Sequence, residues 1–149
     1  MMTLKHEVSI AADVETVWRT LSDLLAVKQH NPSVVSVRIL TDKTTGIGAA
    51  RRCEMRTKDW VEEKVWAFDP PHVIGLEVAA SSWPVAFMKW RTELRPDGRN
   101  TLVKQEMNYK LKFGVLGLLL DKLVMRRKLD ASIQEVFERL KLHVENARP

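Results

Sequence analysis

The stretch KFGVLGLLLDKLVMRRKL, residues 112–129, is the most apolar part of the chain and leads directly into a basic cluster. Its apolar run from Phe113 to Met125 is thirteen residues long and is interrupted by Asp121 and Lys122. A helix that spans a bilayer needs about 20 mostly apolar residues. The stretch is therefore not expected to be transmembrane, and its role must lie within a folded domain.

This stretch begins a long amphipathic helix, which the apolar spacing predicts from about residue 115 to residue 145. Apolar side chains return every three or four residues, while most charged side chains fall on the other face. The apolar face consists of Leu116, Leu119, Leu120, Leu123, Ile133, Val136, Phe137, Leu140 and Val144. A helix of about 30 residues extends roughly 45 Å, so it must lie across a broad apolar surface.

That surface is predicted to be a β-sheet formed by the rest of the chain. TLKHEVSI, residues 3–10, alternates apolar and polar side chains, which is typical of a half-buried strand. Two short helices follow, where Asp13 can cap the first and Pro32 ends the second. From there to residue 111, strand patterns alternate with turn signals such as DPPH and PDGRN. Such short connections join antiparallel strands.

The predicted fold class is therefore α+β, with a curved seven-stranded antiparallel sheet around a long C-terminal helix and two short helices after the first strand. The 149 residues, 45% of them apolar and 29% charged, fit one globular domain over residues 1–149. The net charge of +5 is spread along the chain, with basic residues beside acidic ones. No nucleic-acid partner is expected, because no basic cluster forms a binding footprint. We expect a monomer or a homodimer.

The single cysteine, Cys53, cannot form an intramolecular disulfide. The N-terminus MMTLKHEVSI lacks the apolar run of a secretory signal. The expected location is the reducing cytoplasm.

The order of elements and four motifs resemble the helix-grip superfamily (SRPBCC), which includes START lipid-transfer domains, Bet v 1-like proteins and polyketide cyclase/dehydrase-like proteins. The motifs are V-x-I-x-A-x-x-E-x-V-W at 8–18, GIGAARR at 46–52, EKVWAFDPP at 63–71 and G-x-L-G-x-L-L at 114–120. The resemblance implies that the sheet and the long helix enclose a cavity for an apolar or aromatic small molecule. It does not specify a function, because this fold hosts many.

Strand alternation predicts which side chains face that cavity. The expected ligand-binding residues are Cys53, Met55, Val65, Leu76, Val78, Met88, Trp90, Thr92, Gln105 and Met107, together with Leu119 and Leu123 of the helix. The neutral polar groups of Thr92, Gln105 and Tyr109 can orient a mostly apolar ligand, or can instead satisfy one another. A shift of one residue in register would turn any one strand over.

Glu63 is the principal candidate for chemistry, because it holds the inward E-x-V position of proteins that the chain resembles. A carboxylate among apolar walls can serve as a general acid or base, with His6 or Tyr109 as its partner. Three structural alternatives remain open for Glu63: pairing with an arginine, contact with buried water, or exposure to solvent because Glu62 points inward. His6 has a structural alternative too, since a lone histidine on an apolar face is commonly hydrogen-bonded within the fold.

No metal site and no cofactor are expected. The four histidines lack metal-binding spacing, and Cys53 lacks the surrounding residues of a nucleophilic cysteine. GIGAARR lacks the Lys-Ser/Thr ending of a phosphate-binding loop, so we interpret it as a turn that admits positive φ.

Three functions follow as hypotheses. The first is a small soluble protein that binds a hydrophobic or aromatic small molecule in an internal cavity between sheet and helix. The second is an enzyme of polyketide cyclase or dehydratase type that uses Glu63 as acid or base. The third is a protein-interaction module that docks a partner through residues 113–128.

Overall fold

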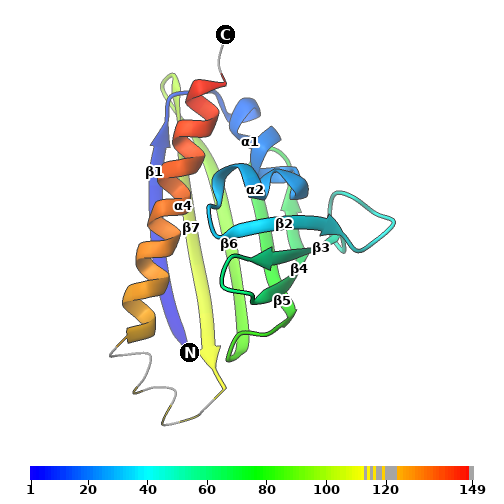
Figure 1. The fold of residues 1–149 in the computed structure, drawn as a ribbon. Coiled ribbons are helices and arrows are strands. Elements are labelled where there is room, and N and C mark those ends of the chain that lie inside the picture. The colour runs from blue at the N-terminus through cyan, green and yellow to red at the C-terminus, as the bar shows by residue number, and fades with distance from the viewer. Residues whose placement is uncertain (113, 115, 117–118, 120–123, 148–149) are drawn as a thin grey trace.

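A computed structural model of the chain describes residues 1–112, 114, 116, 119 and 124–147 (Figure 1). The strands of this described part are β1 (Met2–Ile10), β2 (Val34–Ile39), β3 (Ala50–Met55), β4 (Trp60–Asp69), β5 (Val73–Ser81), β6 (Val85–Asp97) and β7 (Asn100–Leu111). The helices are α1 (Val14–Ser22), the short 3₁₀-helix η1 (Leu24–Ala26), α2 (Val27–His30) and α4 (Arg126–Asn146).

The strands form one antiparallel sheet in the order β1-β7-β6-β5-β4-β3-β2. The predicted turn at PDGRN joins β6 to β7, where Gly98 has a φ of 62° between paired Asp97 and Asn100. Gly46 and Gly48 have positive φ between β2 and β3, in the segment that the sequence predicts to be a turn. A side chain would strain the backbone at such angles.

The first strand and first helix form as their patterns predict. Along β1, Leu4 and Ile10 are buried while Lys5 and Glu7 are exposed. Asp13 caps α1, because its carboxylate accepts a hydrogen bond of 2.8 Å from the backbone N–H of Thr16. The two short helices lie between β1 and β2 in the chain, as predicted.

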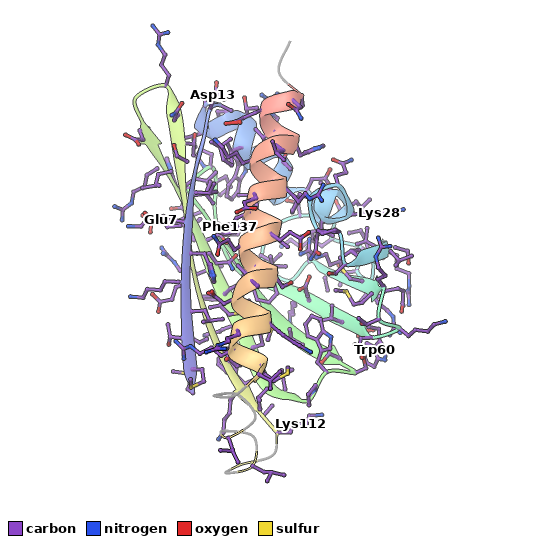
Figure 2. All side chains as sticks on the ribbon, turned by 60° about the vertical axis from the view of Figure 1, so that its left-hand side comes forward. Glu7, Asp13, Lys28, Trp60, Lys112 and Phe137 are labelled. Carbon is purple, nitrogen blue, oxygen red and sulfur yellow. The ribbon has the colours of Figure 1, made fainter. Side chains whose placement is uncertain are left out.

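Helix α4 runs alongside β1 and lies over the sheet, with α1 and α2 near its C-terminal end (Figure 1). It buries Ile133, Phe137, Leu140 and Val144, which belong to the apolar face that the sequence predicts. Figure 2 shows Phe137 on this helix in front of the strands. The predicted beginning of the helix near residue 115 falls in a region that lies largely outside the described residues. Across the residues that are described, no helix has the length and apolar character to cross a membrane.

Within the described part of the chain, the buried apolar side chains form three clusters. The largest packs α1 and the C-terminal half of α4 against the strands, around Ile10, Leu94 and Val103. The second lies near the start of α4, around Tyr109 and Ile133. The third joins α2 to β2, β3 and β4. The core is therefore divided, and the space among its parts is the candidate site.

Candidate functional site

A cavity of about 650 Å³, the central cavity, lies between the concave face of the sheet and α4. All three core clusters contribute to its wall, for example through Leu76, Met107 and Cys53. Its volume falls within the range of small-molecule sites, roughly 300–1,000 Å³, and such sites have mostly apolar walls with a few polar groups. The walls here follow that composition.

Most of the predicted inward residues line the central cavity. They are Cys53, Met55, Glu63, Leu76, Met88, Trp90, Thr92, Gln105, Met107 and Tyr109. Alternation identifies them because antiparallel pairing keeps paired side chains on one face: Trp90, for example, pairs with Leu76 on one side and Met107 on the other.

Four expected ligand contacts have a different outcome. Val65 is buried in the largest core cluster and is not part of the cavity wall. Val78 is half-buried and packs within the apolar clusters beside the cavity. Leu119, expected to cover the sheet, is 57% exposed and does not line the cavity, and Leu116 is 65% exposed. Leu123 lies outside the described residues.

A buried ion pair is the main polar feature of the cavity wall. The Nε of Arg51 donates to Oε1 of Glu63 at 2.7 Å, and each residue is only 7% exposed. The pair forms because the two residues are opposite each other in the β3–β4 register, so their side chains share a face. The Nη1 of Arg51 also donates to the carbonyl of Leu24, which anchors the guanidinium to η1.

Of the alternatives for Glu63, the structure shows pairing with an arginine. Glu62 is not the inward residue: its carboxylate accepts a bond of 3.0 Å from Arg52 in the outward-facing pair of the same two strands. The sequence held a signal for Arg51, because alternation from the inward Cys53 places it on the same face. Only the register of β3 against β4 shows that it meets Glu63.

Two further titratable groups lie beside this ion pair. Burial, reinforced by the positive charge of Arg51 and by His143, lowers the pKa of His30 from 6.5 to about 4. Burial, reinforced by the negative charge of Glu63, raises the pKa of the Cys53 thiol to about 12. The Cys53 sulfur is 4.0 Å from Oε1 of Glu63. Near neutral pH, His30 and Cys53 are therefore uncharged.

The neutral polar groups predicted inside the cavity are placed on other strands. The Thr92 hydroxyl donates to Oε1 of Gln105 at 3.1 Å, so these two groups satisfy each other. Tyr109 is 1% exposed and packs with Leu4, Met88 and other members of its cluster. All three residues line the central cavity.

His6 connects β1 to α4. Its Nε2 lies 2.7 Å from Oδ1 of Asp130, and its ring meets Phe137 edge-on at 6.2 Å between centroids. Its Nδ1 is buried without a hydrogen-bond partner in the described part of the chain. His6 does not line the central cavity.

The sheet order separates Glu63 from both residues expected to be its partner in acid–base chemistry. Glu63 is on β4, whereas Tyr109 is on β7 and His6 on β1. Neighbouring strands are about 4.8 Å apart, so the backbones of Glu63 and Tyr109 are separated by roughly 14 Å of sheet. The structure instead brings Glu63 together with Arg51 and Cys53.

Sequence reasoning missed several residues of the cavity wall. His30 comes from the short helix α2, Trp83 from the β5–β6 connection and Arg51 from an inward position of β3. Ile133, Phe137 and Leu140 come from α4. The α4 residues were predicted as the apolar helix face, but not as ligand contacts. His30 and Trp83 carry no periodic signal, because they lie at the ends of elements or between them.

A curved antiparallel sheet around a long C-terminal helix, with short helices after the first strand, defines the helix-grip class of α+β proteins. Residues 1–145 match the family described as polyketide cyclase / dehydrase and lipid transport, and the chain belongs to this family. No curated protein matches the chain in sequence.

Solved structures show the same fold. TTHA0849 from Thermus thermophilus is 20% identical and superposes with a TM-score of 0.83. The match covers 99% of this chain and 100% of TTHA0849. A START superfamily protein from Mycobacterium smegmatis is 19% identical, with a TM-score of 0.79 and coverage of 98% and 99%. Ara h 8.0201 is 14% identical, with a TM-score of 0.79 and coverage of 97% and 98%. These structures confirm the predicted fold, and the family match confirms the resemblance to polyketide cyclase/dehydrase-like proteins.

Proposed function

We propose that this protein binds a hydrophobic or aromatic small molecule in the central cavity. The observation that carries the proposal is the cavity itself, about 650 Å³ between sheet and α4, with walls from all three apolar clusters. Binding an apolar ligand there removes apolar surface from water, which contributes roughly 25 cal/mol for each Å² buried. We expect the protein to act in the reducing cytoplasm, in keeping with its single buried cysteine.

A helix position at the cavity wall offers a direct test. Ser132 lines the cavity although it is exposed on α4, whereas its neighbour Ala131 is exposed and does not line it. A tryptophan at residue 132 would occupy ligand space without removing a core side chain. Ser132→Trp is expected to weaken the binding of the apolar fluorophore N-phenylnaphthylamine at least about tenfold, equivalent to about 1.4 kcal/mol.

The matched control is Ala131→Trp, which adds the same side chain one position away and should leave the affinity unchanged. Equal affinity of both variants and the parent would show that the fluorophore binds elsewhere. Native mass spectrometry of protein purified from its own host provides a second measurement, and a retained apolar molecule would support the proposal.

An enzymatic role of cyclase or dehydratase type is the second candidate, supported by the carboxylate of Glu63 in the cavity wall and by the family description. Binding ranks first because it needs only the cavity, whereas catalysis needs an acid–base pair and Glu63 is paired with Arg51. If Glu63 is catalytic, Glu63→Gln abolishes turnover of a candidate polyketide-like substrate while the substrate still binds. Unchanged turnover would remove Glu63 from the mechanism.

The protein-interaction hypothesis depends on residues 113–128, most of which lie outside the described residues. It therefore stays a prediction, and co-purification of a partner that is lost on changing this segment would test it.

A further inference from the structure

We infer that the central cavity selects an uncharged ligand whose polar end carries a hydrogen-bond acceptor and donor side by side, and that Arg51 and Glu63 receive this end. A primary amide or a hydroxy-ketone on an apolar body has this chemistry. The inference rests on the proposed function, since it names the class of ligand that the same cavity would hold.

The hydrogen bonds of the ion pair leave one donor and one acceptor available. Arg51 uses Nε for Glu63 and Nη1 for the carbonyl of Leu24. The hydrogen bonds of these two residues within the described part of the chain use neither Nη2 of Arg51 nor Oε2 of Glu63. Among the described residues, the side-chain atoms that are fully buried and lack a hydrogen-bond partner are Nδ1 of His6 and Nδ1 of His30. Nη2 of Arg51 and Oε2 of Glu63 are not among them, so both atoms are accessible. Arg51 and Glu63 both line the cavity.

The polar patch has no net charge. The guanidinium of Arg51 is balanced by the carboxylate of Glu63. His30 and Cys53 beside them are neutral near pH 7, because burial lowers the pKa of the imidazole and raises the pKa of the thiol. An anionic ligand end would lose its hydration on binding beside Arg51, whose charge is already balanced by a carboxylate. A cationic end would lose its hydration beside Glu63, whose charge is already balanced by a guanidinium.

Among the described residues, no hydrogen bond or ion pair joins the other charged residues of the wall to Arg51 or Glu63. Asp23 accepts from the backbone N–H of Leu25, and Asp59 accepts from the hydroxyls of Thr57 and Ser82. Lys128 is exposed on α4.

A neutral end with both groups satisfies the two available atoms at once. Its carbonyl oxygen accepts from Nη2 of Arg51, and its N–H or O–H donates to Oε2 of Glu63. Hydrogen bonds to charged groups are stronger than neutral ones. A site built around such groups also rejects analogues that leave them unpaired.

Three probes with one acyl chain test the inference: lauramide, laurate and methyl laurate. They differ only in the polar end. The amide of lauramide is neutral and has both a donor and an acceptor, laurate ends in an anion, and the ester of methyl laurate is a neutral acceptor without a donor. Displacement of N-phenylnaphthylamine measures their affinities. Lauramide is expected to bind at least about tenfold more tightly than either of the others, equivalent to about 1.4 kcal/mol.

Two variants assign the selectivity to the ion pair. Arg51→Met with Glu63→Leu removes both charges, which leaves no unpaired ion in the core, and lauramide should lose its advantage over methyl laurate. Glu63→Gln leaves the charge of Arg51 unbalanced, so the preference should shift from lauramide toward laurate. The control is Arg52→Met with Glu62→Leu, the outward ion pair of the same strands, and it should keep the parent selectivity.

The outcomes separate this inference from the proposed function. Tighter binding of laurate than of lauramide to the parent protein, or equal binding of lauramide and methyl laurate, would overturn the inference and leave the cavity as a ligand site. Parent selectivity that persists in the Arg51/Glu63 double variant would also overturn it. Binding of none of the three probes would count against the proposed function and against this inference together.

Discussion

Acidification is expected to destabilise the folded protein through His30. This residue ends α2, is 8% exposed, and has an Nδ1 that is buried without a partner among the described residues. Burial, then the charge of Arg51, then His143 lower its pKa from 6.5 to about 4. Each of these causes disfavours the protonated imidazolium, and each is present only in the folded state.

The sign and size of the effect follow from proton linkage. Above pH 6.5 the imidazole is neutral in both the folded and the unfolded chain, so its contribution is fully present. As the pH falls from 6.5 to about 4, the unfolded chain takes up a proton that the folded chain does not. At about 1.4 kcal/mol for each pKa unit, the free energy of unfolding falls by about 3 kcal/mol over this window.

Urea unfolding followed by tryptophan fluorescence measures this loss in the parent and in His30→Gln. Other groups titrate in both proteins, so the difference between their free energies of unfolding isolates His30. That difference should change by about 3 kcal/mol between neutral pH and about pH 4, to the disadvantage of the parent. His72→Gln is the control, because His72 is exposed. Equal losses of stability in the parent and in His30→Gln would refute the reasoning.

Three further predictions concern packing and reactivity. The Cys53 thiol, with its pKa raised to about 12 by burial and by Glu63, should react slowly with a disulfide reagent until urea unfolds the chain, and rapid labelling of the native protein would contradict this. Leu140→Ala should destabilise the fold by about 2–5 kcal/mol, since this side chain is 1% exposed, whereas Leu142→Ala, at a position 52% exposed, should change stability by less than about 0.5 kcal/mol. Gly75→Ala should lower the free energy of unfolding in urea by about 1–3 kcal/mol, because its Cβ would lie 2.7 Å from Cε2 of Trp66. An equal loss of stability in a Trp66→Ala background would exclude that clash as the cause.

The fold could be predicted from the sequence because its signals are local and periodic. Alternation along β1 identified its buried face, Asp13 identified the start of α1, and the glycines at 46, 48 and 98 marked turns with positive φ. Short connections then required antiparallel neighbours, and seven such strands with a long apolar helix allow few arrangements.

The candidate site was predictable only in part. Alternation assigns a side chain to a face of the sheet but not to a height along the strand, so Val65 was expected in the cavity and instead packs in the core. Helical spacing likewise assigns Leu119 to an apolar face without showing whether a strand lies beneath it, and that residue is exposed. Contacts from short helices and connections, such as His30 and Trp83, have no period from which they could be identified.

The sequence by itself determined the class of fold, the concave face of most strands and the buried face of the terminal helix, because each of these depends on residue spacing within one element. Only the tertiary structure decided the partner of Glu63. The β3–β4 register places Arg51 opposite it, and η1 fixes the guanidinium through the carbonyl of Leu24. The same sheet order sets His6 on β1 and Tyr109 on β7, both away from Glu63 on β4. Which groups meet depends on contacts between residues far apart in the chain, and spacing within an element carries no information about them.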